Sequence, residues 1–247
     1  MKTTRTPWLT WAPTGETGVA ALSVLAMIAL YWVTTQVLVS GWSVILVFGL
    51  LTNMGLNFIF PLWWIVAYRR QPLSELGLTS RRWLISVFIG GVLAALMAFR
   101  LRTSLVGVDW GPHLLFNAVV LWEPFFVHGW LQLRFERAFG ILPGILLAAL
   151  CFAAYHIGTY PPAALLAIFA SGLFYAAVFR LTGNLLIVWP LLWCLGSSFG
   201  TLMGGTQFNW AEAGIWSAIL VVQLAILAWI WQRQTRRGEF TAKIAAG

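Results

Sequence analysis

The sequence predicts an all-α fold, a polytopic bundle of about eight transmembrane helices, and two observations support this prediction. First, 60% of the 247 residues are hydrophobic and only 9% are charged, whereas roughly 25% are charged in an ordinary soluble domain. Second, apolar runs of about 20 residues, the length that crosses a bilayer, recur along the whole chain. The composition therefore excludes a soluble globular domain, and it also excludes a disordered chain.

Eight candidate spans follow one another with short connections. Their expected ranges are 18–40, 43–68, 83–100, 113–135, 141–158, 161–180, 184–203 and 213–232. The third and fifth are short for a full crossing, and the second contains Pro61, which predicts a kink or a tilt. No internal repeat or linker divides the chain. We therefore expect one membrane domain, 1–247, with short basic tails at 1–17 and 233–247.

The basic residues predict the orientation of these spans. With the N-terminus inside, thirteen of the fifteen basic residues fall on the inner side, and only Arg100 and Arg102 fall outside. The thirteen are Lys2, Arg5, Arg69, Arg70, Arg81, Arg82, Arg134, Arg137, Arg180, Arg233, Arg236, Arg237 and Lys243. The positive-inside rule then places both termini in the cytoplasm. The net charge of +8 reflects this topology, so lipids are expected partners and nucleic acid is not.

Very few ionisable residues lie at membrane depth, where a charge is costly and usually faces a cavity or a partner. They are Glu123, His128 and His156, with His113 at the outer end of its span. At the helical rise, Glu123 and His156 stand roughly 18 and 22 Å above the inner ends of consecutive spans. A glutamate and a histidine at similar depth suit a general base that activates water. The alternative is that each is a structural group, hydrogen-bonded to a neighbouring helix.

The same residues argue against a metal site, and they place His128 on a different face of the helix from Glu123. Two ligands are too few to close a metal site, so we expect neither a metal nor another cofactor. His128 lies about 140° around an ideal helix from Glu123, although Pro124 between them loosens that geometry. We therefore assign His128 a supporting role.

Two motifs resemble those of the CAAX protease and bacteriocin-processing family of intramembrane glutamic endopeptidases. They are Glu123-Pro-Phe-Phe-Val-His128-Gly129 and Phe152-Ala-Ala-Tyr-His156. The family motifs are Glu-Glu-x-x-x-Arg-Gly, Phe-x-x-x-His and, further on, His-x-x-x-Asn. Segments 74–78 and 182–185 also look like the family's flanking turns, so the resemblance covers roughly residues 70 to 200.

The resemblance implies roles for individual residues. Glu123 would activate the attacking water and His156 would hold and polarise it, while Phe152 lies one turn before His156 on the same face. Gly129 matches the small residue that closes the first motif.

The chain departs from the family pattern at four positions. Pro124 replaces the second Glu, and His128 replaces the Arg. Trp193 and Ser197 stand at the His and Asn positions of the third motif, which the family uses to stabilise the oxyanion. Loss of one oxyanion donor typically costs about 10²–10³-fold in rate.

Three functions remain open from the sequence. The first is a metal-independent intramembrane endopeptidase, a hydrolase acting on a membrane-associated peptide or protein in a prokaryotic plasma membrane. The second is a catalytically inactive relative that acts as a scaffold, a chaperone or a subunit of a larger membrane complex. The third is a pigment or cofactor protein with His113, His128 or His156 as an axial ligand. Nothing in the sequence selects a particular substrate.

Overall fold

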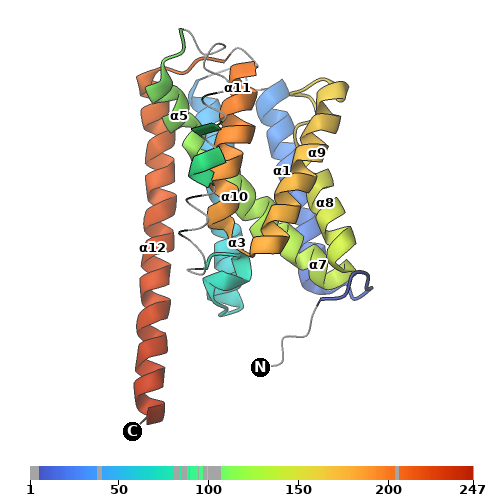
Figure 1. The fold of residues 1–247 in the computed structure, drawn as a ribbon, viewed down its shortest axis with the longest axis vertical. Helices are drawn as coiled ribbons and strands as arrows, with labels where there is room; N and C mark the ends of the chain where they lie inside the picture. Colours follow the sequence, from blue (N-terminus) through green and yellow to red (C-terminus); the bar gives the residue numbers. More distant parts are fainter. Residues whose placement is uncertain are drawn as a thin grey trace.

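The structure is a computed structural model that describes residues 6–37, 41–79, 107–203 and 206–246, with scattered positions between 84 and 99. It is a helical bundle (Figure 1). The expected third span, 83–100, falls mostly outside the described residues. The helices are α1 (Gly15–Gln36), α2 (Trp42–Val44), η1 (Ile45–Ile59), α3 (Phe60–Leu62), η2 (Trp63–Tyr68), η3 (Leu73–Leu76), α5 (Trp110–Ala118), η4 (Val119–Leu121), α6 (Trp122–Pro124), η5 (Phe125–Gln132), α7 (Leu133–Phe139), α8 (Ile141–Ala154), α9 (Pro162–Thr182), α10 (Leu185–Leu191), η6 (Leu192–Ser198), α11 (Phe199–Met203) and α12 (Trp210–Ala246).

Consecutive helices join into rods that are long enough to cross a membrane. The described residues contain six such rods: Gly15–Gln36, Trp42–Tyr68, Trp110–Phe139, Pro162–Thr182, Leu185–Leu202 and Trp210–Arg236. α8 is a shorter apolar helix. These rods confirm the predicted all-α, polytopic membrane bundle. The count of eight spans and the cytoplasmic position of the termini remain predictions.

The rod Trp110–Phe139, which we call the central rod, is surrounded by the others. In its most apolar window 83% of the residues are buried, against 22–33% in the other five rods. A helix that is apolar on all sides belongs in the interior of a bundle, so Glu123 lies on the element that is furthest from lipid. Pro124 has no backbone N–H. The rod is 3₁₀-helical just before α6, where Pro124 lies, and π-helical just after it.

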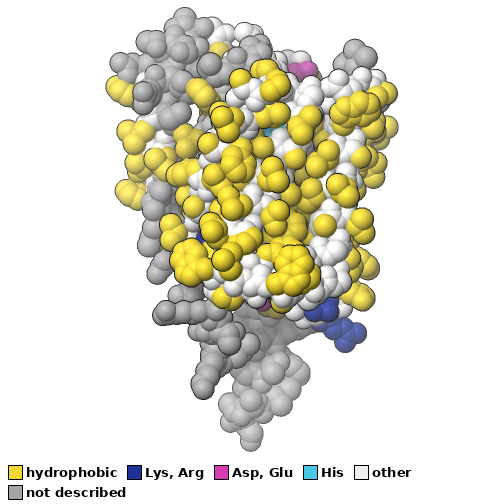
Figure 2. Space-filling view, turned by 90° about the vertical axis from the view of Figure 1, so that its right-hand side faces the viewer, with side chains coloured by type: hydrophobic (Ala, Val, Ile, Leu, Met, Phe, Trp, Pro, Cys, Tyr) yellow, Lys and Arg dark blue, Asp and Glu magenta, His cyan; other side chains and the backbone are white. Residues whose placement is uncertain are grey.

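The connections that the sequence places on the inner side meet at one end of the bundle, which we call the basic end. Backbone hydrogen bonds there join the N-terminal segment to the α7–α8 connection, and Leu185 to Gly77. The side chain of Gln234 on α12 accepts from the backbone N–H of Leu73. In Figure 1 this end is the lower one, and α12 extends beyond it. Figure 2 shows a cluster of basic side chains at the lower edge of a face that is otherwise largely apolar.

The opposite end, which we call the far end, holds the C-terminal end of α1 and the start of α5, α9 and α12 (Figure 1). Gln36 donates from its side chain to the carbonyl of Gly158 there, at 3.0 Å. An added Cβ on Gly111 would lie 2.6 Å from the ring of Trp210, which shows how closely α5 and α12 approach.

Candidate active site

One cavity brings together four of the residues that the sequence predicts for the site. It has a volume of about 380 Å³ and lies between α1, η1, the central rod, α8, α9 and the η6–α11 segment. The predicted residues on its wall are Glu123, Phe152, His156 and Ser197. Other polar and aromatic residues on the wall include Tyr31, Asn53, Asn117, Trp122, Tyr155, Tyr160 and Tyr175. His128 and Trp193 do not line this cavity.

Glu123 is a buried carboxylate with free oxygens. Its residue is 6% exposed, and within the described part of the chain no hydrogen bond or ion pair reaches its carboxylate. It shares the cavity wall with Tyr31, Tyr160 and Tyr175. Buried polar groups are almost always hydrogen-bonded, so an unpaired one calls for an explanation. A carboxylate that faces a cavity and has no protein partner is available to water or to a ligand.

His156 follows the C-terminal end of α8, and its ring has a defined tautomer. Its Nδ1 lies 2.8 Å from the carbonyl oxygen of Phe152. Because a carbonyl only accepts, Nδ1 carries the proton and Nε2 of the neutral ring is the acceptor. Aromatic rings fix the position of this ring, with centroids at 4.1 Å for Tyr155, 5.4 Å for Phe152 and 5.5 Å for Tyr160. The Phe-x-x-x-His spacing thus serves both to orient and to pack the histidine.

Glu123 and His156 share the cavity without touching in a hydrogen bond. Both residues are on its wall, and their joint role in catalysis stays a prediction. No direct hydrogen bond joins them among the described contacts. A water bound between the carboxylate and Nε2 is therefore the arrangement that would connect them.

The third-motif positions form a closed polar network instead of a set of free donors. Ser197 donates its hydroxyl to Oδ1 of Asn117 at 2.6 Å. The amide nitrogen of Asn117 donates to the carbonyl of His113 at 2.8 Å and to the hydroxyl of Thr201 at 3.2 Å. His113 in turn donates from Nε2 to the carbonyl of Ser198 at 3.0 Å. The donors of Ser197 and Asn117 are therefore already used.

Trp193, at the His position of that motif, points elsewhere. Its indole N–H donates to the carbonyl of Leu114 at 2.9 Å, which ties η6 to α5. The structure thus gives this residue a packing contact away from the cavity wall.

Tyr175 is a residue of the site that the sequence analysis missed. It lies on α9, is only 2% exposed and lines the cavity. Its hydroxyl has no hydrogen-bond partner in the described residues, and it would lie 3.3 Å from a Cβ on Gly196, next to Ser197. A phenol placed in this way is a free donor that faces the same space as Glu123. The available signal was a tyrosine deep within an apolar span.

Asn117 was also missed, although it stands four residues after His113. The two repeat the His-x-x-x-Asn spacing of the third motif on the central rod. In the structure their polar atoms meet Ser197, Ser198 and Thr201, the segment where that motif was sought.

His128 begins a chain of hydrogen bonds that leads away from the cavity. It is fully buried, and its Nδ1 donates to Oε1 of Gln132 at 2.9 Å. Gln132 donates to Glu136 at 2.8 Å and to the carbonyl of Ala176 at 2.9 Å. Glu136 pairs with Arg180 at 3.1 Å. This chain ties the central rod to α9, so His128 supports the fold around the site.

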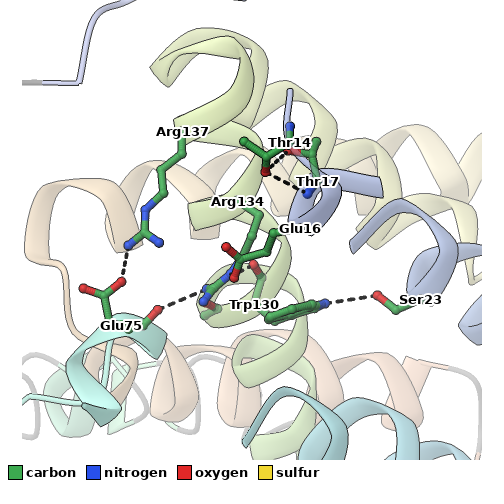
Figure 3. A network of polar contacts seen from close by, with 9 residues as sticks. Thr14, Glu16, Thr17, Ser23, Glu75, Trp130, Arg134 and Arg137 are labelled. Atoms are coloured by element: carbon green, nitrogen blue, oxygen red, sulfur yellow. Dashed lines mark hydrogen bonds and ion pairs between the residues drawn. The ribbon is translucent and has the colours of Figure 1, made fainter. Parts of the chain in front are cut away.

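A second polar network, shown in Figure 3, fastens the basic end. Arg134 is 1% exposed on its side chain and pairs with Glu16 at 3.2 Å. It also donates to the carbonyls of Gly129 at 2.9 Å and Glu75 at 3.1 Å, and it stacks over Trp130. Arg137 forms an ion pair with the side chain of Glu75. The network joins α1, η3 and the central rod.

Gly129, the small residue that closes the first motif, permits a close backbone contact. A Cβ at this position would lie 2.6 Å from the carbonyl oxygen of Leu76 and 3.0 Å from the side chain of Leu185. Only glycine lets η3 approach the central rod this closely.

The described residues offer no group of three or more His, Cys, Asp and Glu side chains that would hold a metal ion. The cavity wall carries a carboxylate, a neutral imidazole and a phenol. In a polytopic membrane bundle, this set defines a candidate hydrolytic site within the membrane.

A comparison with protein families supports a hydrolytic site of the protease type. A family model described as type II CAAX prenyl endopeptidase, Rce1-like, matches residues 110–195. The matched range contains Glu123, Phe152 and His156, and it confirms the resemblance found in the sequence. No curated protein and no solved structure matches the chain. The family match and the apolar helices together support a protease-type function in an integral, multi-pass membrane protein.

Proposed function

We propose that this protein is an intramembrane endopeptidase in which Glu123 activates a water molecule to attack a peptide bond. The observation that carries the proposal is the Glu123 carboxylate, which is buried on a cavity wall and has no partner among the residues that the structure describes. His156, on the same wall, presents an acceptor nitrogen. A carboxylate kept unpaired in the interior costs stability, which is expected where the group has a chemical role.

The geometry suggests a course for the reaction. Glu123 takes a proton from water as the water oxygen bonds to the carbonyl carbon, while Nε2 of His156 accepts a hydrogen bond from the same water. The carbonyl oxygen becomes an oxyanion, which the hydroxyl of Tyr175 stabilises. Glu123 then gives its proton to the leaving nitrogen as the C–N bond breaks. Each of these steps uses only side chains of this chain and the attacking water.

Tyr175 fills the role left vacant by the third motif. Ser197 and Asn117 use their donors on each other and on their neighbours. The hydroxyl of Tyr175 has no partner in the described residues and lies beside Gly196, next to Ser197, so we assign it as the donor to the oxyanion.

The cavity also fits a peptide substrate by size and character. Its volume of about 380 Å³ lies within the range of about 300–1,000 Å³ that is usual for ligand pockets. Aromatic and aliphatic side chains make up most of its wall. Such a wall suits the apolar residues of a membrane-associated peptide.

Because the substrate is unidentified, the test compares all new protein N-termini in membranes. Cells would express the wild type, Glu123→Gln or Glu212→Gln, and N-terminal peptides would be quantified by mass spectrometry. Glu212 is an exposed carboxylate at the start of α12, which makes it a matched control. We expect a set of N-termini that appears with the wild type and with Glu212→Gln, and that falls by at least about 10³-fold in rate with Glu123→Gln. Equal cleavage by Glu123→Gln would contradict the mechanism.

A second candidate function is a non-catalytic relative that acts within a membrane complex. The observation in its favour is that Ser197, Asn117 and Trp193 all use their donors in contacts within the protein. This function predicts a stoichiometric membrane partner on purification, together with no N-termini that depend on Glu123.

A further inference from the structure

We propose that the site receives its peptide from the extracytoplasmic side of the membrane, through an opening beside α9. This inference rests on the proposed function and names its substrate class: a segment of a membrane-anchored or transmembrane protein exposed at the outer leaflet. It differs from a site that would receive the C-terminus of a cytoplasmic protein.

The cavity lies in the half of the bundle that is away from the basic end. Along the central rod, Glu123 is about 16 Å from Arg134 at the helical rise. Along α1, Tyr31 is about 22 Å from Glu16. Further wall residues come from the first turns of α9, the α8–α9 connection and the η6–α11 segment, and these parts of the wall lie towards the far end. Tyr175 lies deeper, in the second half of α9.

Buried apolar side chains close the path from the basic end to Glu123. Phe125, Phe126, Val127 and Trp130 follow Glu123 on the central rod, and each is 0% exposed. Below them the Arg134 network fastens α1 and η3 to the rod (Figure 3). A peptide cannot enter from this end without displacing a packed core.

The wall of the cavity reaches the surface of the protein on α9. Among its lining residues, Ala167 and Ser171 are exposed. Both side chains are small, so they do not cover the space behind them. α9 and α10 are joined by a short turn at the basic end, and the exposed lining residues lie on α9 away from this turn. The opening therefore lies at the side of the bundle, above the α9–α10 turn.

The distribution of charge assigns this half of the molecule to one side of the membrane. Thirteen of the fifteen basic residues belong to segments predicted on the inner side, and the described ones gather at or beyond the basic end. The positive-inside rule places that end in the cytoplasm. The cavity, in the other half, then opens towards the extracytoplasmic face.

Cysteine labelling in intact cells tests this sidedness without any measurement of activity. In a Cys151→Ala/Cys194→Ala background, three single variants would be made: Ser171→Cys at the opening, Thr206→Cys at the far end and Ser74→Cys at the basic end. Residues 74, 171 and 206 are all exposed. The probe is a charged, membrane-impermeant methanethiosulfonate, which reacts with thiols that water reaches.

We expect Ser171→Cys and Thr206→Cys to be labelled at least about 10-fold faster in intact cells than Ser74→Cys, which should react only after permeabilisation. Labelling of Ser74→Cys from outside would overturn the orientation. Labelling of Ser171→Cys only after permeabilisation, or not at all, would overturn the extracytoplasmic opening.

A second measurement separates this inference from the proposed function. Two single-span reporters would carry one cleavable segment, drawn from the N-termini that depend on Glu123, at their extracytoplasmic or their cytoplasmic flank. We expect cleavage of the first reporter only. Cleavage of the second alone would overturn the sidedness, whereas a labelling pattern as expected with neither reporter cut would leave the sidedness standing and contradict the endopeptidase.

Discussion

The two halves of the central rod differ in whether their buried charged side chains have hydrogen-bond or ion-pair partners. In the half near the basic end, Gln132, Arg134 and Glu136 are buried and each has hydrogen bonds or ion pairs to other helices. In the half that faces the cavity, His113 and Asn117 are also hydrogen-bonded, whereas the carboxylate of Glu123 has no partner in the described residues. The first pattern holds the helices in one arrangement, because loss of either partner would leave an uncompensated charge in the interior. The second pattern is the one expected of a reactive group.

An unpaired polar group by itself does not mark the site. Asn53 on η1 is fully buried, lines the cavity and has both amide atoms unpaired. Asn57 and Gln223 are equally unpaired and do not line the cavity, and nothing in the structure explains them. Tyr155 likewise lines the cavity with an unpaired hydroxyl. Among these unpaired groups on the wall, Glu123 is the carboxylate, so its chemistry and not its lack of a partner singles it out.

The sharpest test of the stabilising half is Arg134→Gln. Removal of one member of a buried ion pair leaves its partner and two carbonyls without donors, so we expect a loss of about 3–5 kcal/mol in unfolding free energy. Thermal unfolding in detergent would measure it. The matched control is Arg137→Gln, because the Arg137–Glu75 pair is exposed and such pairs contribute at most about 1 kcal/mol. Equal unfolding free energies for Arg134→Gln and Arg137→Gln would contradict the claim that the buried pair contributes more to stability than the exposed pair.

The sharpest test of the reactive half, beyond Glu123 itself, is Tyr175→Phe. We expect kcat to fall by about 10²-fold, as for the loss of one oxyanion donor, while the thermal unfolding temperature and KM stay close to those of the wild type. Tyr68→Phe, on an exposed tyrosine of η2, is the control and should leave kcat unchanged. A Tyr175→Phe variant that keeps full activity would remove Tyr175 from the mechanism.

Gly129→Ala tests the junction between the two halves. The added methyl group would meet the Leu76 carbonyl at 2.6 Å, so η3 must move, and we expect a loss of about 1–3 kcal/mol in unfolding free energy. Gly18→Ala on α1 is the control, because a Cβ there meets nothing within 4 Å. A stable Gly129→Ala variant would show that η3 moves away without cost.

The smallest effect is expected for Ser197→Ala. The hydroxyl donates to Asn117 and is not free for substrate, so its removal should lower kcat by less than about 10-fold, well short of the roughly 10²–10³-fold loss of an oxyanion donor. Steady-state kinetics on a single-span reporter with a cleavable extracytoplasmic segment would measure the change in kcat. A loss of about 10²-fold or more would mean that Ser197 turns to the substrate during the reaction, as the aligned Asn of the family motif would.

The sequence predicted the helices and the shared position of Glu123 and His156 for clear physical reasons. Apolar runs of membrane length report spans directly. Glu123 and His156 belong to consecutive apolar segments of the sequence, so helical rise predicts similar depths, and the structure puts both on one cavity wall. Gly129 also has a local role, as the resemblance indicated.

The rest depended on contacts between helices that are distant along the chain. Tyr175 becomes a candidate only when α9 is seen to place its hydroxyl beside Gly196. The network of Asn117 with Ser197 joins residues that are eighty positions apart. Helical periodicity does not report which faces meet, so the sequence did not reveal that Ser197 has its donor engaged. The sequence also indicated no hydrogen-bond partner for His128, whereas in the structure His128 donates to Gln132.

The most direct test of the account follows the water oxygen. The purified protein would be placed in liposomes with a tethered peptide reporter in water enriched in ¹⁸O, and mass spectrometry would examine the carboxyl group released in a single turnover. We predict one ¹⁸O in the new carboxylate with the wild type, and no product above background with Glu123→Gln. Product that carries ¹⁸O and forms at the wild-type rate in Glu123→Gln would contradict the assignment of Glu123 as the group that activates water.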